Sequence, residues 1–298
     1  MTKTVFITIA GRTNAGKSSL LNALIGEKIA SVSSKSQTTR TKITGVVNVD
    51  ETQLVFIDTP GLHKARNKLS EYMLKAVRDS SEDIDAIFFM ADCTRPLGQQ
   101  EKEMLASFNA QKTPVVLILN KIDLLEDKAQ LAKMISEVSS EFVFEDVIPI
   151  SVIMNDGVDI VLDKALEMAV ESPHFFGPDT ITDQPEKVIA GEIVREKLLE
   201  LLDDEVPHGI AVAVETMRER DDKDLLDISA VIFCEKASHK GIIIGKGGRM
   251  LKKAASLARE ELEEFFQIKV NLQCWVKVKE DWRNREALIR TFGLSDKD

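Results

Sequence analysis

Residues 11–18 read G-R-T-N-A-G-K-S, and this stretch decides the fold because it fits the pattern G-x-x-x-x-G-K-S between two predicted elements. The preceding residues 4–10 form a short, β-branched, apolar run that is typical of a buried parallel strand, and residues 19–25 carry leucines at helical spacing. A chance glycine-rich turn with a solvated Lys17 is the alternative, but that reading does not account for the strand and helix around it. The sequence therefore predicts a phosphate-binding loop, or P-loop.

The chemistry of such a loop follows from its backbone. Glycines let successive N–H groups turn inward around phosphate oxygens at a helix N-terminus, where the helix dipole adds positive potential. Lys17 is expected to reach the β- and γ-phosphates, and the Ser18 hydroxyl to take one coordination position on Mg²⁺. The predicted nucleotide-binding residues of the loop are Gly11, Asn14, Ala15, Gly16, Lys17, Ser18 and Ser19.

Length and composition favour a two-domain protein of ordinary soluble character. The chain has 298 residues, of which 44% are hydrophobic and 30% charged, and no apolar run approaches the length of a membrane span. The N-terminal apolar run leads directly into the P-loop, so we expect a core strand there and a cytoplasmic protein. Cys93, Cys234 and Cys274 are far apart and lack a C-x-x-C pair, which argues against a disulfide framework or a zinc site. The formal net charge of −10 means that any nucleic-acid binding must use a local basic patch.

A polar stretch follows the first predicted helix. Residues 26–42 are rich in Ser, Thr and Lys and lack apolar periodicity, which predicts an exposed, mobile loop. Within it, residues 37–40 read Q-T-T-R, and a threonine such as Thr39 can complete the Mg²⁺ shell only when a γ-phosphate is present. The alternative is a merely solvated loop. Its position between two stronger motifs favours a nucleotide-dependent switch.

A second polar motif follows a predicted hairpin of an edge strand at 43–48 and a core strand at 53–57. Residues 58–61 read D-T-P-G, and Asp58 at the end of a parallel strand is well placed to hold a water on Mg²⁺. Gly61 can present its backbone N–H to a γ-phosphate because no Cβ obstructs the approach. In isolation a simple turn would explain these residues equally well.

The base-reading motif is expected after the strand at residues 114–119. There the sequence reads N-K-I-D, and the Asp123 carboxylate can accept from both the N1–H and the exocyclic amine of guanine, whereas adenine offers no such donor pair. Asn120 is expected to tie this loop to the P-loop, and the stem of Lys121 to cover one face of the base. Strands at 85–92 and 147–151 and helices at 69–80, 99–109 and 157–170 complete the alternation of a doubly wound, mostly parallel α/β sheet.

The second half of the chain has a different pattern. Residues 171–185 contain three prolines and predict a linker, in which Phe175 and Phe176 are expected to pack on a surface. An α+β domain follows, with a glycine motif at its centre, Gly245-Lys246-Gly247-Gly248. Its predicted elements are helices at 188–202, 249–266 and 281–292 and strands at 209–217, 225–234 and 268–278.

Basic residues are concentrated around that glycine motif. No Asp or Glu occurs between Glu235 and Glu260, although the chain as a whole is acidic. A glycine loop lets a nucleic-acid backbone approach closely, lysines neutralise its phosphates, and residues 242–244 would supply an apolar groove wall. The alternative is that these isoleucines are core and the lysines a solvated face. The predicted RNA-binding residues are Lys240, Ile242, Ile244, Gly245, Lys246, Gly247, Gly248, Arg249, Lys252 and Lys253.

The first half carries G-R-T-N-A-G-K-S, Q-T-T-R, D-T-P-G and N-K-I-D in this order. With these four motifs it resembles a translation-factor-class GTPase domain of Ras-like fold. The resemblance implies a guanine-capping role for Ser151 and Val152, although the family usually has Ser-Ala there. Leu62 stands where Ras has the glutamine that orients the attacking water, which implies slow intrinsic hydrolysis. In GTPases with such a substitution, a P-loop asparagine, here Asn14, is associated with a bound potassium ion. His63 is an alternative base, but a loop histidine is more often solvent-facing.

The whole chain resembles the Era family of bacterial GTPases, which have a C-terminal type II KH domain. Besides the motifs above, residues 181–183 (I-T-D), 192–198 (E-I-V-R-E-K-L) and 275–279 (W-V-K-V-K) carry the resemblance. It implies a GTPase domain at 1–172, a linker at 173–185 and an RNA-binding KH domain at 186–298. It also implies binding of the 3′ end of 16S ribosomal RNA in 30S subunit assembly and peripheral membrane association. We expect a monomer, although the sequence does not determine the oligomeric state.

The expected activity is therefore GTP hydrolysis, with GTP or GDP, Mg²⁺ and K⁺ as ligands. The expected metal ligands are Ser18, Thr39 and Asp58, and the expected catalytic residues are Lys17, Thr39, Gly61 and Asn14. The remaining predicted nucleotide contacts are Asp58, Gly61, Leu62, Asn120, Lys121, Asp123, Ser151 and Val152. Two other functions stay open: an RNA-binding protein with a vestigial nucleotide site, and a small-molecule P-loop kinase.

Overall fold

A computed structural model of the chain describes residues 1–33, 35, 38–61, 67–79, 84–203, 206–292 and 294. The chain divides into two compact units. Unit 1 comprises Met1–Ala30, Thr39–Lys64 and Met73–Asp183, and unit 2 comprises Ser31–Thr38, Ala65–Tyr72 and Gln184–Asp298. Two short stretches of the N-terminal half thus belong to unit 2, which no sequence pattern indicated.

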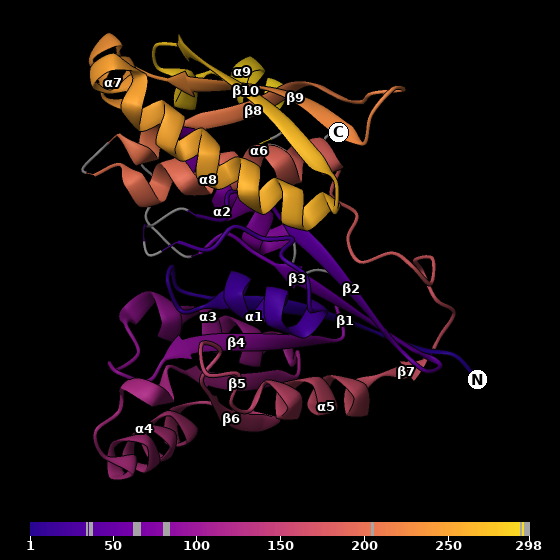
Figure 1. The fold of residues 1–298 in the computed structure, drawn as a ribbon. Coiled ribbons are helices and arrows are strands. Elements are labelled where there is room, and N and C mark those ends of the chain that lie inside the picture. Colours follow the sequence, from indigo (N-terminus) through magenta and orange to yellow (C-terminus); the bar gives the residue numbers. More distant parts are fainter. Residues whose placement is uncertain are drawn as a thin grey trace. The chain divides into compact units, whose positions relative to one another are not determined.

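Unit 1 is built on one mostly parallel sheet with the order β2-β3-β1-β4-β5-β6 (Figure 1). The first strand is central: β1 pairs in parallel with both β3 and β4, as expected for strands joined by helical crossovers. The edge strand β2 is antiparallel to β3, which confirms the predicted hairpin. The strands are β1 (Lys3–Gly11), β2 (Ile43–Val49), β3 (Thr52–Asp58), β4 (Ala86–Asp92), β5 (Val115–Asn120), β6 (Asp146–Ile150) and β7 (Val170–Glu171).

Helices cover both faces of this sheet. On one face α3 and α4 share a hydrophobic cluster with β4 and β5, in which Phe89, Leu117 and Leu105 are fully buried. On the other face α1 and α5 pack against each other and against β1 and β3. The helices are α1 (Lys17–Ile25), α3 (Gln99–Gln111), η1 (Ile122–Leu124), α4 (Lys128–Glu141) and α5 (Val158–Met168), while α2 (Lys68–Asp79) has residues in both units. The predicted doubly wound architecture is confirmed.

Three sequence predictions for unit 1 need correction. Helix α4 was not predicted, and its N-cap Asp127 accepts a hydrogen bond from the Ala129 N–H at 2.8 Å. The helix predicted at 157–170 ends at Met168, because Val170 and Glu171 form β7 and pair antiparallel with β1. The loop at 26–42 is not exposed throughout, since five of its residues are buried: Ile29, Ala30, Ser31, Thr39 and Arg40.

The buried start of that loop is held by one side chain of α1. The Asn22 amide donates to the carbonyl oxygen of Ala30 at 2.8 Å and accepts from the N–H groups of Ile29 and Ala30 at 3.1 and 2.9 Å. A side-chain amide that satisfies three backbone groups replaces the regular ladder that this segment lacks. The backbone of Ile29 and Ala30 is therefore fixed against α1.

Unit 2 contains a three-stranded sheet with the order β10-β9-β8. The central strand β9 is antiparallel to β8 and parallel to β10, and α6 and α8 pack together on the sheet around a core that includes Ile193, Leu198, Ile232 and Leu262 (Figure 1). The elements are α6 (Glu186–Leu201), η2 (Pro207–Gly209), β8 (Ala211–Glu219), β9 (Leu225–Cys234), α7 (Ala237–Ile244), η3 (Lys246–Gly248), α8 (Arg249–Phe266), β10 (Lys269–Val278), η4 (Trp282–Asn284) and α9 (Glu286–Thr291).

The C-terminal part differs from its prediction in two places. Helix α7 was not predicted, and the expected helix at 281–292 is a 3₁₀ turn followed by the short α9. The turn is anchored by Trp282, which is fully buried and donates its indole N–H to the carbonyl oxygen of Gly209 at 2.9 Å. None of the helices in the described part of the chain has the length and hydrophobicity needed to cross a bilayer.

Candidate functional site

The P-loop joins the end of β1 to the start of α1, as the motif predicts. Its last glycine, Gly16, has φ 106°, and a Cβ there would lie 2.3 Å from the side-chain nitrogen of Asn120. Only glycine fits this position, because a side chain would be strained and would collide with Asn120 at the end of β5. Asn14 also has a left-handed backbone, with φ 62°, and Ser19 continues α1 after Ser18.

The two charged groups at the base of the P-loop are buried. The Lys17 ammonium donates to the carbonyl oxygens of Gly11 and Arg12 at 3.2 and 3.0 Å. Burial lowers the pKa of Lys17, and burial also raises the pKa of Asp58, although each charge partly offsets the other. A bound anion beside Lys17 and a bound cation beside Asp58 would offset the free-energy cost of burying each charge.

Three predicted metal ligands come together from distant parts of the chain. The Ser18 hydroxyl oxygen lies 2.7 Å from that of Thr39 and 2.6 Å from the Asp58 carboxylate, and Thr39 donates to the same carboxylate oxygen at 3.3 Å. The second carboxylate oxygen of Asp58 is buried and has no hydrogen-bond partner among the described residues. Hydroxyl and carboxylate oxygens are the ligands that Mg²⁺ prefers, so these residues fit that ion.

Gly61 lies against the backbone of the P-loop. A Cβ at Gly61 would come within 2.6 Å of the Cα of Thr13, so the two backbones approach more closely than any side chain would allow. This places the N–H of Gly61 near the loop expected to hold phosphates. Leu62 and His63, and also Gln37 of the Q-T-T-R motif, fall outside the described residues.

The predicted base-reading residues also converge. The Asn120 amide donates to the carbonyl oxygen of Ala15 at 2.8 Å, and its oxygen accepts from the Val152 N–H at 3.1 Å. The Ser151 hydroxyl donates to the Asp123 carboxylate at 2.6 Å, which would hold that carboxylate in one orientation. Asn120 therefore ties the P-loop to both loops that would contact a base.

Lys121 has a partner that the sequence analysis did not identify. Its ammonium forms an ion pair with Asp92 at 2.6 Å, and hydrogen bonds from Lys121 and Thr94 hold the pKa of Asp92 below its ordinary value. Because the head group is fixed this way, the aliphatic stem is held at the site. Beside it, a cavity of about 410 Å³ is lined by Ile122, Asp123, Leu125, Leu131, Ser151, Met154 and Asp156.

The glycine motif of unit 2 joins α7 to α8. Gly245, Gly247 and Gly248 all have positive φ, and the four cations nearest the motif, Lys246, Arg249, Lys252 and Lys253, are exposed. Within the described ranges these four cations and the half-buried Lys240 make no ion pair, so their charge is available to phosphates. Arg259, by contrast, is paired with Glu263 at 2.8 Å.

Of the two isoleucines predicted to contact RNA, Ile242 is 49% exposed, whereas Ile244 is half-buried against the core. Ile243 between them is fully buried. The apolar wall predicted for residues 242–244 is therefore mainly Ile242.

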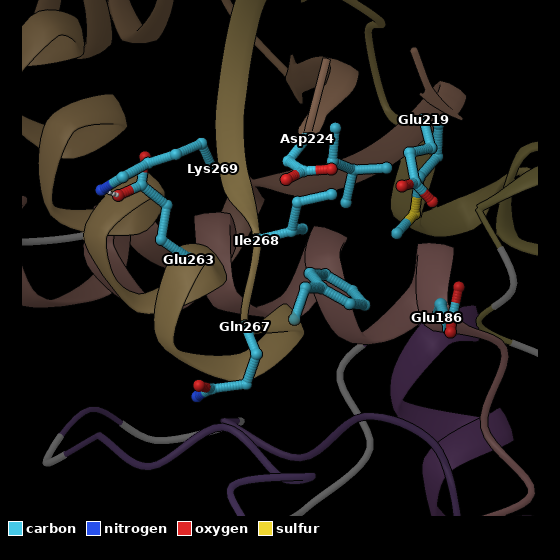
Figure 2. Close-up of a pocket in the computed structure, with 10 residues that line it drawn as sticks. Glu186, Glu219, Asp224, Glu263, Gln267, Ile268 and Lys269 are labelled. Carbon is cyan, nitrogen blue, oxygen red and sulfur yellow. Dashed lines mark hydrogen bonds and ion pairs between the residues drawn. The ribbon is translucent and has the colours of Figure 1, made fainter. Parts of the chain in front are cut away.

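Lys240, Lys246, Arg249, Lys252 and Lys253 form a basic surface, which does not extend to the C-terminal end of α8. At the C-terminal end of that helix a depression of about 810 Å³ is lined by four carboxylates and one ammonium, and Glu263 and Lys269 form an ion pair at 2.9 Å (Figure 2). The helix has 18 residues, so this acidic depression lies about 26 Å from the glycine motif. Phosphates would be repelled there, which limits the candidate RNA surface to the N-terminal half of α8.

Comparison with known proteins follows the same division of the chain. Two protein-family models match it, one described as "50S ribosome-binding GTPase" over residues 6–121 and one described as "KH domain" over residues 205–283. The GTPase Era of Ruminiclostridium cellulolyticum is 49% identical over 291 residues, which cover 98% of this chain and 97% of the relative. The chain belongs to the Era family of GTPases. The GTPase Era of Clostridioides difficile is 45% identical over 297 residues, covering 100% of each chain.

Two solved Era structures match the fold. Aquifex aeolicus Era bound to GDP and AlF₄⁻ has a TM-score of 0.95, and Era in complex with MgGDPNP and nucleotides 1506–1542 of 16S ribosomal RNA has a TM-score of 0.94. Each is 35% identical, and each match covers 99% of this chain and 100% of the other. The predicted fold class, a P-loop GTPase domain followed by a KH domain, is confirmed.

Sequence reasoning on this Era-family chain missed Asp92, which ends β4 beside β5 and holds Lys121 of the base-reading motif. The burial of Arg195 and Glu196 on α6 was also missed. They lie on the face of α6 opposite Ala190 and Val194, where the helical pattern predicts exposure to solvent. Their partners within unit 2, among them the carbonyl oxygen of Thr38 that accepts from Arg195, lie more than 150 residues earlier in the chain.

Proposed function

We propose that this chain binds GTP with Mg²⁺ at the P-loop, hydrolyses it, and couples its nucleotide state to binding of the 3′ end of 16S ribosomal RNA during 30S subunit assembly. One observation carries the proposal. Ser18, Thr39 and Asp58 meet at one point, and Thr39 directly follows a segment, Ser31–Thr38, that belongs to unit 2 with the glycine motif. A change of ligand at Thr39 would therefore act on a segment held by the RNA-binding unit.

Each residue of the nucleotide site has a proposed role. Lys17 and the P-loop amides would hold the phosphates, and Ser18, Thr39 and Asp58 would hold Mg²⁺ directly or through water. Bound Mg²⁺ would neutralise charge on the β- and γ-phosphates. Gly61 would donate its N–H to the γ-phosphate, and Asn14 would help to hold K⁺. Leu62 lacks a polar group to orient the attacking water, so we expect slow hydrolysis without an activating partner.

The base would be selected by Asp123. Its carboxylate would accept two hydrogen bonds from guanine, with Ser151 and Val152 capping the base and Lys121 covering one face. Asp123→Asn exchanges one acceptor for a donor, so we expect preference to move from GDP to XDP in competition titrations. A variant that kept tight GDP binding and rejected XDP would contradict this assignment.

RNA binding is tested with the oligonucleotide of nucleotides 1506–1542 that the Era complex contains. Gly247→Asp adds a carboxylate at φ 60° in open space, where it would face phosphates. The matched control is Gly26→Asp, at φ 80° and also in open space, but at the end of α1. In anisotropy titrations we expect Gly247→Asp to weaken RNA binding about tenfold or more with GTPase activity retained, whereas Gly26→Asp leaves RNA binding unchanged.

Two other proposals follow from the family assignment. We propose that the protein is cytoplasmic, with peripheral contact at the membrane, and that it acts as a monomer. Among the alternatives, a vestigial nucleotide site predicts that Ser18→Ala binds RNA as well as wild type, whereas we expect this change to weaken Mg²⁺-dependent GTP binding and to uncouple RNA binding from the nucleotide. A small-molecule kinase would need neither the Asp123 site nor the basic surface of unit 2. That function would be supported only by transfer of phosphate from the nucleotide to a metabolite.

A further inference from the structure

The end of strand β4 lies beside the base-reading motif. Asp92, the last residue of β4, is the register partner of Asn120, the last residue of β5, and the Cys93 N–H donates to the carbonyl oxygen of Asn120 at 3.0 Å. The residue that follows Asn120 in the chain is Lys121. All four residues belong to unit 1, and they share the edge of the sheet where the parallel strands end.

The two carboxylate oxygens of Asp92 have separate partners. One oxygen accepts from the Thr94 N–H at 3.0 Å and from the Thr94 hydroxyl at 2.6 Å, which fixes the carboxylate on its own turn. The other oxygen accepts from the Lys121 ammonium at 2.6 Å. The side chains of Asp92 and Lys121 are 13% and 27% exposed, so salt screens this ion pair less than a pair on the open surface.

The backbone of Lys121 has an unfavourable conformation. Its φ of 73° lies in the left-handed region, which a residue with a Cβ keeps only where its surroundings hold it. The ion pair with Asp92 fixes the far end of the same side chain. Because both the Cα and the ammonium are fixed, the aliphatic stem between them has few conformations left. Such a stem is ordered before a nucleotide arrives, and binding then costs less entropy.

We propose that Asp92 is a positioning residue for guanine-nucleotide binding, which holds the stem of Lys121 in place to cover the base. Thr94 in turn fixes Asp92. The inference rests on the proposed nucleotide-binding function, and it assigns a role to a residue outside the four GTPase sequence motifs. The stem would cover the face of the base, which guanine and hypoxanthine share, and not the edge that Asp123 reads. Loss of Asp92 should therefore weaken binding of both bases equally.

The test uses the full-length protein and three substitutions in unit 1. Asp92→Ala removes the carboxylate, Asp92→Glu keeps a carboxylate one methylene farther out, and Lys121→Met keeps an apolar stem without its ammonium. The matched control is Glu141→Ala, which removes a carboxylate that Lys102 holds at 2.8 and 2.7 Å in the same unit, and neither of these two is a predicted site residue. Affinities for GDP and inosine diphosphate (IDP) with Mg²⁺ are measured beside kcat and KM for GTP, and urea denaturation reports stability.

We expect Asp92→Ala to raise the Kd for GDP and for IDP by the same factor of about ten, the cost of ordering one long side chain on a strained backbone. KM for GTP should rise by a similar factor while kcat stays within about twofold of wild type, because the lost contact is equal in the ground and transition states. Asp92→Glu should recover part of the affinity, and Glu141→Ala should leave the affinities unchanged. In a Lys121→Met background, Asp92→Ala should have almost no further effect on GDP affinity.

Three results would overturn the inference. A lower free energy of unfolding for Asp92→Ala with unchanged GDP affinity would mean that the ion pair only stabilises the fold. A loss confined to GDP would mean that Asp92 acts through the edge of the base read by Asp123. Independent effects of Asp92→Ala and Lys121→Met would mean that Asp92 does not act through the lysine.

The test stays informative if one variant is unstable. If Asp92→Ala folds poorly, Asp92→Glu and Lys121→Met carry the same comparison of GDP with IDP. A wild-type protein that binds no guanine nucleotide would contradict the proposed function itself. Tight binding by wild type with an unaltered affinity of Asp92→Ala would contradict only this inference.

Discussion

Asn120→Ala would test whether the P-loop and the base-reading loops act as one preassembled site. The substitution removes the donor to the Ala15 carbonyl and the acceptor for the Val152 N–H, at 2.8 and 3.1 Å. Leaving such buried groups unpaired costs about 1–3 kcal/mol each, so the two together correspond to about 2–6 kcal/mol. The nucleotide would have to supply this free energy when it brings the loops together, which weakens binding about 30- to 20,000-fold.

The assay is a titration with fluorescent GDP, beside urea denaturation of the same variants. The control is Asn109→Ala, since Asn109 makes the same two-way clamp to the backbone of Val143, at 3.0 and 2.9 Å, and neither residue is a predicted site residue. We expect Asn109→Ala to leave GDP affinity unchanged. If Asn120→Ala lowers the free energy of unfolding while the folded protein binds GDP as tightly as wild type, the P-loop and the base-reading loops do not act as one preassembled site.

Three further predictions concern other parts of the molecule. Trp282→Phe leaves a buried carbonyl without its donor, so the free energy of unfolding should fall by about 1–3 kcal/mol in urea titrations. Burial raises the pKa of Cys93 and of Cys274 to about 11, so iodoacetamide at pH 8 should modify both thiols at least about tenfold more slowly in the native than in the unfolded chain. Hydrogen bonds from Arg220 and a neighbouring amide hold the pKa of Asp227 at about 2, below its unfolded value of about 3.9, so its contribution to stability is present above that value and is lost as the pH falls toward 2. An NMR titration should find that Arg220→Met moves the pKa of Asp227 upward.

The residues predicted for the nucleotide site come together in the structure because each of their motifs is local. A P-loop needs only its own glycines and one lysine, and Asp58 and Asn120 end strands whose parallel order puts their side chains at one edge of the sheet. Predictions failed where distant residues decide the outcome. The loop after α1 looked exposed because its sequence is polar, yet Asn22 and the face of α6 bury its ends. A hydrophobic pattern predicts which face of a helix is buried, but it does not identify the hydrogen-bond partners of a buried arginine such as Arg195.

The distance along the chain between Thr38 and Arg195 has a consequence for biosynthesis. The two residues are 157 positions apart, so at about 5–20 residues per second a ribosome needs about 8–31 s to add the second after the first. During that interval the early segment has left or is leaving the exit tunnel while its anchoring helix does not yet exist. Nascent chains that have extended well past residue 38 but not yet to residue 195 should therefore be cut by a protease at residues 31–33, and released full-length protein should resist cleavage there.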